Sequence, residues 1–278
     1  MHQPVTLPHA HSFDLAAGEG PAWRIFIAVP RETPPPGGFP VLYLLDANAG
    51  FATLVEALRR GAERPQGTGV TPAVIVGIGY PAEGVYDRAR RTFDYTAGPS
   101  AEASPPGGDA RATGGRDAFL AFIEEVLKPR IARECPVDPG RQALIGHSLA
   151  GWFVLDVLCR NTACFQSYVA ISPSIWWDEP RLLDGLAHLA RGPRRLAVMV
   201  GEWEQQLAPW QRGLPQSAEM LERRARRAMA DRARALSQAA AEALGPQARV
   251  AFTLMADEDH ASIVPAAMTR ALRFVLRP

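Results

Sequence analysis

Residues 143–151 read ALIGHSLAG and join an apolar strand pattern to the start of an apolar helical pattern. Ser148 stands at the bend between the two, where a tight, strained turn projects a serine hydroxyl beyond the end of a sheet. The small residues Gly146 and Ala150 let strand and helix pass closely, so the pattern is G-x-S-x-A. We interpret this segment as a nucleophile elbow. The alternative is that Ser148 only caps the helix.

Short apolar runs alternate with amphipathic helical patterns along the chain, which is typical of a mostly parallel sheet covered by helices on both faces. We expect about seven strands, at 23–29, 40–45, 73–78, 143–145, 168–171, 196–200 and 250–254. Helices are expected at roughly 50–60, 116–133, 149–160, 181–190, 215–244 and 261–276. Together with the elbow, this order predicts an α/β protein with the α/β-hydrolase fold.

We predict a single domain over residues 1–278, with a helical excursion at 205–245. Residues 97–115 are dense in Pro, Gly, Ser and Ala and carry no periodicity. Such a segment is typical of a long mobile loop, which serves either as a lid or as a disordered surface excursion.

The composition excludes several classes of function. With 30 Lys and Arg against 29 Asp and Glu, the net charge of +1 gives no reason to expect nucleic acid or an anionic membrane as partner. Three cysteines without CxxC spacing argue against a zinc site or a disulfide framework. We therefore expect no metal and no cofactor.

No signal peptide or membrane span is visible, so we expect a cytoplasmic protein, or a periplasmic one if a leader was removed.

A serine nucleophile near neutral pH needs a base, which is normally histidine. His260 lies between the last strand and the last helix, the position that this fold gives to its base after the serine and the acid. His147 occupies the x position of the elbow and should point away into neighbouring structure. The other four histidines lie before the first strand or within a helical pattern: His2, His9, His11 and His188.

The acid should follow a strand between the serine and the histidine. The run 196–200 is that strand, and Glu202 and Glu204 come directly after it. We favour Glu204, with Glu202 as the alternative acid. Asp257 and Asp259 are reserve candidates that more plausibly shape the loop before His260.

Seven blocks, in this order, match a known family. They are PVLYLLDAN (40–48), VGIGYP (76–81), RRTFDYT (90–96), GHSLAG (146–151), ISPSIWW (171–177), VGEWE (200–204) and DHAS (259–262). Together they resemble the esterase branch of the α/β hydrolases that contains the enterobactin (enterochelin) and bacillibactin siderophore esterases. The ISPSIWW and RRTFDYT blocks are far more specific than the elbow alone.

The resemblance implies Ser148 as nucleophile and His260 as base. The backbone N–H of Leu149 is one expected oxyanion donor, and the resemblance places the second in Asp46-Ala47-Asn48, at Ala47 or Asn48. The family usually has Gly where Ala47 stands. Some siderophore esterases resemble a Ser–His dyad, which leaves the importance of the acid open.

The resemblance also implies a small-molecule substrate, the trilactone of a ferric catecholate siderophore. Such a trianionic complex requires cations and aromatic faces near the serine. The candidates are Arg88, Arg90, Arg91, Trp176 and Trp177. Arg90 and Arg91 are equally consistent with a structural pair to Asp94 or with a solvated loop. Trp176 and Trp177 are equally consistent with core or rim packing. The basic run 223–227 fits either a basic cap over the site or a solvated helix face, and we favour the solvated face.

Any iron would arrive with the substrate. Two other functions fit the same residues: a general carboxylesterase, thioesterase or acyltransferase, and a catalytically silent binding module. The sequence does not give the oligomeric state.

Overall fold

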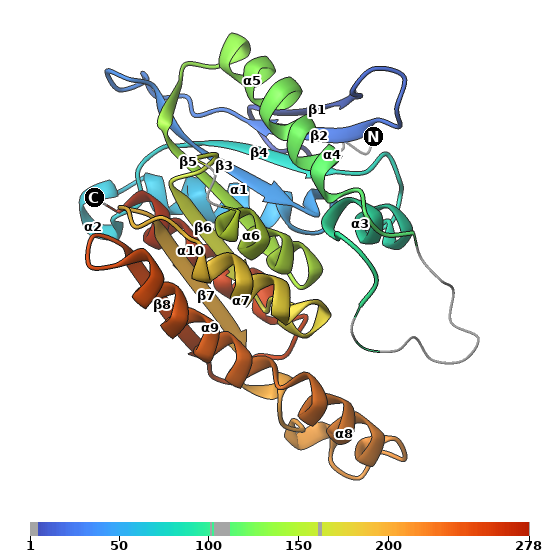
Figure 1. Cartoon of the computed structure of the whole chain (residues 1–278). Helices are drawn as coiled ribbons and strands as arrows, with labels where there is room; N and C mark the ends of the chain where they lie inside the picture. Colours follow the sequence, from blue (N-terminus) through green and yellow to red (C-terminus); the bar gives the residue numbers. More distant parts are fainter. Residues whose placement is uncertain (1–4, 101, 103–111, 161–162, 278) are drawn as a thin grey trace, which may run out of the picture.

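A computed structural model describes residues 5–100, 102, 112–160 and 163–277 of the chain. Its described strands form one eight-stranded sheet in the order β1-β2-β4-β3-β5-β6-β7-β8 (Figure 1). The six strands from β4 to β8 run parallel, and β1 and β2 add an antiparallel edge. The strands are β1 (Ala10–Leu15), β2 (Trp23–Ala28), β3 (Phe39–Leu45), β4 (Val74–Gly79), β5 (Val137–His147), β6 (Ser167–Ile171), β7 (Arg195–Gly201) and β8 (Arg249–Met255).

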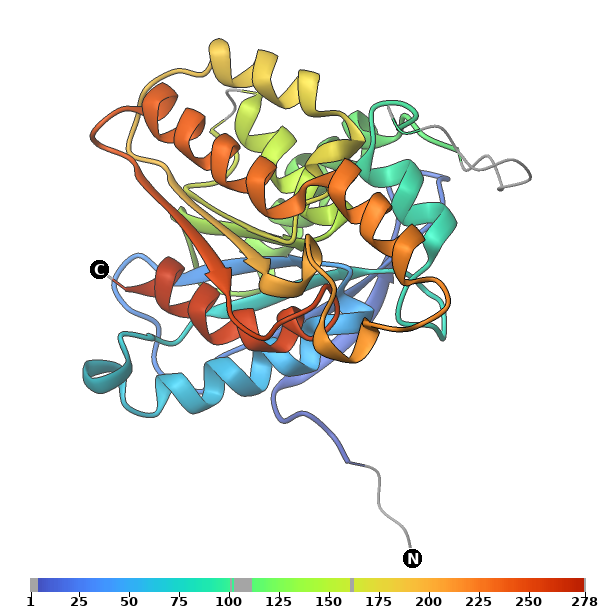
Figure 2. The same cartoon turned by 90° about the horizontal axis from the view of Figure 1, so that it is seen from below.

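Helices cover both faces of the sheet (Figure 2). One face carries α1 (Ala47–Ala62) and α10 (Ile263–Leu276), whose apolar residues form one buried cluster with the strands. The other face carries α6 (Leu149–Cys159), α7 (Glu179–Ala187), α9 (Met229–Leu244) and the continuous α4–η1–α5 segment (Arg116–Ala121, Phe122–Leu127 and Lys128–Glu134), which form a second cluster. The central strands β3 and β4 are buried along their whole length because both faces are covered.

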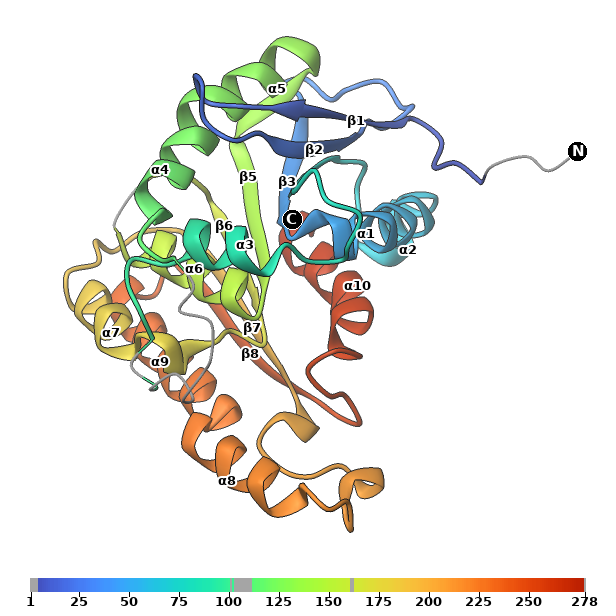
Figure 3. The same ribbon diagram turned by 90° about the vertical axis from the view of Figure 1, so that its right-hand side faces the viewer.

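Shorter elements complete the chain (Figure 3). They are α2 (Pro65–Thr68), α3 (Arg88–Tyr95), η2 (Ile175–Trp177), η3 (Glu202–Glu204), η4 (Pro209–Gln211) and α8 (Ser217–Arg227), the last of which projects beyond the sheet. Among the described helices, none is long and apolar enough to cross a membrane.

The predicted fold class and all seven predicted strands are confirmed. Two elements of the sheet edge and site side were not predicted: β1, an edge strand with a partly exposed AHSFDL pattern, and α3, whose sequence RARRTFDY is strongly polar. The helical pattern expected at 215–244 is two helices, α8 and α9, separated at Ala228. Much of the loop predicted at 97–115, namely residue 101 and residues 103–111, lies outside the described residues.

Candidate active site

The candidate catalytic side chains meet at one edge of the sheet. Ser148 follows β5, Glu204 lies in the short helix after β7, and His260 lies in the loop after β8. Because these strands are parallel, their carboxyl ends share an edge, which is where open α/β sheets place their sites.

Ser148 occupies a strained turn between β5 and α6. Its backbone has φ 60° and ψ −117°, a conformation that costs a non-glycine residue about 1–3 kcal/mol. Its N–H donates to the carbonyl of Ile171 at 2.9 Å. A Cβ on Gly146 would lie 2.4 Å from the carbonyl oxygen of Ala150, so only glycine lets strand and helix cross this closely. The local sequence thus builds the bend that exposes the hydroxyl.

Two hydrogen bonds connect the serine, the histidine and the glutamate. His260 Nε2 lies 3.0 Å from Ser148 Oγ, and His260 Nδ1 lies 2.6 Å from Glu204 Oε2. This is the geometry in which an imidazole accepts the serine proton while a carboxylate orients the ring. The structure therefore brings the three favoured residues together.

Glu204 is buried and fully hydrogen-bonded. Its side chain is 1 % exposed, and its second oxygen, Oε1, accepts from the backbone N–H of Gly201 at 2.7 Å and from the hydroxyl of Ser172 at 2.5 Å. A buried carboxylate is stable only when its oxygens have such partners. Ser172 was not among the predicted site residues, although it opens the Ser-Pro-Ser part of the ISPSIWW block.

The alternative acid lies elsewhere. Glu202 Oε2 accepts from the backbone N–H of Asp257 at 2.8 Å, so Glu202 supports the loop before the histidine rather than its imidazole. Asp259 accepts from the N–H groups of Ala261 and Ser262, and the Ser262 N–H is the main cause of its lowered pKa. Asp257 Oδ1 accepts from the indole N–H of Trp203 at 3.1 Å.

We expected His147 to point away from the site, but its ring lies beside that of His260. Its ring centroid lies 4.6 Å from that of His260. Burial, together with the neighbouring His260, lowers the pKa of His147 to about 3, so its imidazole is neutral at ordinary pH. Within the described structure its Nε2 atom is buried and has no hydrogen-bond partner. The x position of the elbow gave no signal of this contact.

The candidate oxyanion donors begin two helices. Leu149 is the first residue of α6 and Ala47 the first of α1, and N–H groups at this position have no acceptor within their own helix. The methyl group of Ala47 fits because β4 has Gly77 beside it, where a Cβ would lie 2.6 Å away. Asn48 uses its side chain to hold the end of β4: Oδ1 accepts from the N–H of Tyr80 at 2.8 Å.

Two of the predicted substrate ligands bind the protein itself. Arg91 Nη2 lies 2.7 Å from Asp46 Oδ2, and Arg90 Nη1 donates to the carbonyl of Ala22 at 2.6 Å. Arg90 also lies 3.8 Å from Asp94, the structural pairing considered above. The geometry therefore favours structural roles for both arginines, whose side chains are mostly buried. Arg88 is exposed at the start of α3.

Trp176 and Trp177 are the last two residues of η2, a helix that begins directly after Ser174. The Oγ of Ser174 lies 3.3 Å from Ser148 Oγ. Trp177 donates its indole N–H to the carbonyl of Gly98, and Trp176 stacks under Arg227 at 3.8 Å. Arg227 is also paired with Glu102 at 2.6 Å, so this member of the basic run is not simply a solvated side chain.

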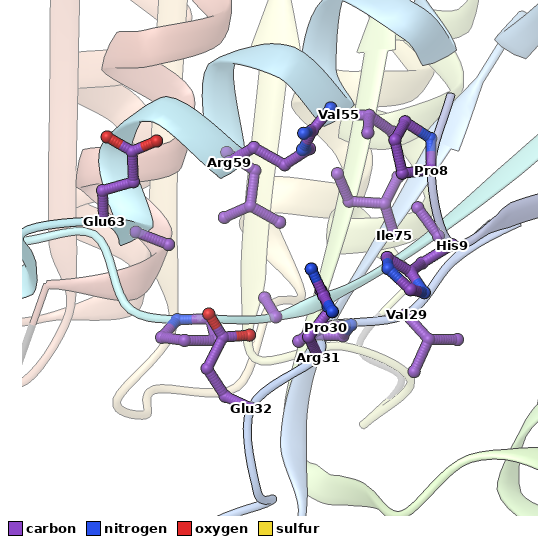
Figure 4. Close-up of a pocket in the computed structure, with 15 residues that line it drawn as sticks. Pro8, His9, Val29, Pro30, Arg31, Glu32, Val55, Arg59, Glu63 and Ile75 are labelled. Carbon is purple, nitrogen blue, oxygen red and sulfur yellow. The ribbon is translucent and has the colours of Figure 1, made fainter. Parts of the chain in front are cut away.

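A separate hollow of about 410 Å³ lies at the opposite edge, where β4 begins (Figure 4). Apolar residues such as Val55 and Ile75 form much of its lining, with Arg31, Arg59 and Glu63 among its charged residues. None of the described residues that line it is a serine, threonine or cysteine. It therefore offers no hydroxyl or thiol nucleophile. Among the described residues, no group of three His, Cys, Asp or Glu is arranged to hold a metal ion.

Comparisons with known proteins identify the family of this chain. The family model described as "Putative esterase" matches residues 20–258. The chain is 39% identical over 270 residues to the ferri-bacillibactin esterase BesA of Bacillus subtilis (strain 168), covering 94% of this chain and 86% of the relative. It is 34% identical over 254 residues to a siderophore enterobactin esterase of Emericella nidulans, covering 84% and 81%.

Two solved structures share the whole architecture. The BES protein from Bacillus cereus superimposes with a TM-score of 0.83 at 32% identity, covering 99% of this chain and 98% of that one. The siderophore hydrolase EstB from Aspergillus nidulans gives a TM-score of 0.82 at 29% identity, covering 98% and 96%. From these matches and the family model, this chain belongs to the esterase family of α/β hydrolases, enzymes that act on ester bonds.

Proposed function

We propose that this chain is a serine esterase that hydrolyses the ester bonds of a ferric siderophore, with Ser148 as nucleophile, His260 as base and Glu204 as acid. The observation that carries the proposal is the continuous hydrogen-bonded path from Glu204 through His260 to the Ser148 hydroxyl. A serine that only capped a helix would have no reason to meet an oriented imidazole.

In the first half of the reaction, Ser148 Oγ attacks the ester carbonyl while His260 Nε2 accepts its proton. The negative charge that forms on the carbonyl oxygen is stabilised by the N–H groups of Leu149 and Ala47. The buried carboxylate of Glu204 stabilises the imidazolium. When the intermediate collapses, His260 returns the proton to the departing alkoxide and an acyl-enzyme remains.

In the second half, a water molecule attacks the acyl carbonyl. His260 takes one proton from this water, and the tetrahedral intermediate then releases Ser148, which recovers that proton. The products are the free acid and the regenerated hydroxyl. Each lactone bond is opened by the same two steps.

The substrate class rests on the relatives and on the surroundings of the serine. The similar proteins bear names that refer to esterases of bacillibactin, enterobactin and triacetylfusarinine C. Trp176 lies two residues after Ser174, whose Oγ is 3.3 Å from Ser148 Oγ, and it carries the guanidinium of Arg227 on its ring at 3.8 Å. Arg88 is exposed at the start of α3. An anionic catecholate complex matches such a surface. We therefore propose a ferric catecholate trilactone.

The test compares p-nitrophenyl butyrate with ferric enterobactin. We expect wild type to hydrolyse both, with a higher kcat/KM for the ferric trilactone. Ser148→Ala should lower kcat for both by a factor on the order of 10⁴ or more, because the nucleophile is lost. Turnover of simple esters alone would refute the siderophore proposal, and turnover of neither would refute the serine mechanism. Labelling by an organophosphonate should occur at Ser148 and persist in Ser174→Ala.

The same assay distinguishes the two glutamates. Glu204→Gln should reduce kcat by about 10²–10⁴-fold, because the amide neither stabilises the imidazolium nor fixes the tautomer. Glu202→Gln is the matched control and should stay within about threefold of wild type, since the Glu202 carboxylate accepts from the backbone N–H of Asp257 and not from His260. Equal losses in the two variants would contradict the assignment of the acid.

A further inference from the structure

The RRTFDYT block at 90–96 is one of the most distinctive parts of the sequence, yet it contributes no side chain to the triad. Two of its members converge on Asp46, the last residue before α1. Arg91 Nη2 donates to Asp46 Oδ2 at 2.7 Å, and Arg91 Nε lies 3.1 Å from both carboxylate oxygens. Tyr95 donates its hydroxyl to Asp46 Oδ1 at 3.0 Å.

Asp46 has an unusual backbone that these contacts support. Its φ of 52° and ψ of 43° place it in the left-handed region, which is unfavourable for residues other than glycine. The hydroxyl of Tyr95 also accepts the backbone N–H of Asp46 at 3.2 Å, so the clamp holds both the side chain and the main chain. The Arg91 and Asp46 side chains are only 14% and 4% exposed, which shields the pair from solvent.

The conformation of Asp46 determines how α1 begins. The carbonyl of Asp46 accepts from the N–H of Ala49 at 2.9 Å, and Ala47 follows Asp46 as the first helical residue. The direction of the Ala47 N–H is therefore fixed by the peptide bond that joins it to Asp46. On the other side of the turn, Asn48 is anchored to the backbone of Tyr80.

We propose that Arg91 and Tyr95 are positioning residues for the oxyanion hole: they hold Asp46 in its left-handed conformation so that the Ala47 N–H points at the developing oxyanion. This inference rests on the proposed serine mechanism. In this role Arg91 stabilises the transition state indirectly, through the backbone conformation of Asp46, and does not contact an anionic substrate. Substitution of Arg91 should therefore change kcat far more than KM.

The test uses Arg91→Lys and Tyr95→Phe with p-nitrophenyl butyrate, an uncharged ester that needs no cation for binding. We expect kcat to fall by about 10–100-fold, somewhat less than the loss of an oxyanion donor itself, while KM stays within about twofold. The inhibition constant of an alkyl boronic acid, which forms a tetrahedral adduct with the serine, should rise by the same factor as kcat falls.

Two matched variants test for general destabilisation. Arg116→Lys alters another shielded ion pair, in which Arg116 lies 2.7 Å from Asp156 and the side chains are 12% and 2% exposed. Tyr168→Phe removes the hydroxyl of a buried tyrosine in β6. Both should keep the wild-type kcat and boronate affinity even where urea unfolding shows lower stability.

The outcomes are separable. If Arg91→Lys and Tyr95→Phe raise KM for ferric enterobactin but leave kcat and boronate affinity unchanged, Arg91 acts on the substrate and the inference is wrong. If the two control variants lose kcat to the same extent, the effect is general stability and the inference is again wrong. If wild type hydrolyses no ester and reacts with no boronate, the proposed function itself fails.

Discussion

The two histidines at the site differ in surroundings and in state. His260 is half exposed and lies between the serine and the glutamate, whereas His147 is partly buried, with its ring centroid 4.6 Å from that of His260. Because burial holds the pKa of His147 near 3, the neighbouring imidazole remains uncharged when His260 gains a proton during the reaction. A positive charge at position 147 would disfavour the imidazolium by like-charge repulsion.

This difference predicts how stability depends on pH. The folded-state pKa of about 3 lies below the unfolded value of about 6.5, so below pH 6.5 the unfolded chain binds a proton that the native state does not bind. The stability present above pH 6.5 is therefore lost as pH falls toward 3. Between pH 6 and 4, the unfolding free energy of wild type should fall by about 1.4 kcal/mol per pH unit more steeply than that of His147→Gln.

Urea unfolding at pH 6, 5 and 4 measures these slopes. His188→Gln, at an exposed histidine that follows α7, is the control and should keep the wild-type slope. Parallel slopes for wild type and His147→Gln would show that His147 is protonated in the folded protein.

The site residues that could be predicted from the sequence are those whose position relative to the strands is typical of the fold. Ser148 and His260 follow from the elbow and from the loop after the last strand, and the structure brings them within 3.0 Å. His147 and Ser172 could not be placed in this way, because their roles depend on side-chain directions across neighbouring strands. The structural roles of Arg90 and Arg91 depend on contacts with Ala22 and Asp46, which are far away in the sequence.

At the scale of elements, the helices and strands that could be predicted from the sequence are those with a clear apolar pattern. The central strands β3, β4 and β6 are buried on both faces and read as continuous apolar runs, which made them predictable. The more exposed β2 and β8 were found because their sequences, WRIFIA and RVAFTLM, are still mostly apolar. Two of the elements that were not predicted, α3 and β1, have largely polar sequences. For α3, the N-terminal Asp87 accepts from the N–H of Arg90 and stabilises the helix without an apolar stripe.

The break between α8 and α9 had no signal in the sequence, because alanine and arginine continue through it. Ala228 has φ 42° and ψ 48°, a left-handed conformation that is costly for alanine. It ends α8, where its N–H donates to the carbonyl of Arg224 at 2.8 Å.

We predict that Ala228→Gly raises the free energy of unfolding by about 0.5–1 kcal/mol, because glycine adopts this conformation without strain. The matched control is Ala225→Gly, which places glycine at an exposed position inside α8 and should lower stability by up to about 1 kcal/mol. Urea unfolding followed by circular dichroism measures both. A loss of stability in Ala228→Gly would show that the break is not strained.

On the scale of the whole molecule, the site depends on one continuous sheet. Its contributors come from Asp46 to His260 and are placed by β3, β5, β6, β7 and β8, which are neighbours in the sheet. Buried clusters on both faces hold these strands in register. Glu204, His260 and Ser148 lie after three different strands, and their hydrogen bonds of 2.6 and 3.0 Å therefore require that the strands keep their register.

The dependence on one sheet predicts that activity and fold are lost together. In urea, hydrolysis of p-nitrophenyl butyrate and tryptophan fluorescence should share one midpoint, because the fully buried Trp152 lies in α6, the helix that directly follows Ser148. Far-UV circular dichroism should give the same midpoint, and dilution from urea should restore all three signals. Activity that disappears at a lower urea concentration than the circular dichroism signal would mean that the site unfolds apart from the sheet, which would contradict a single domain over residues 1–278.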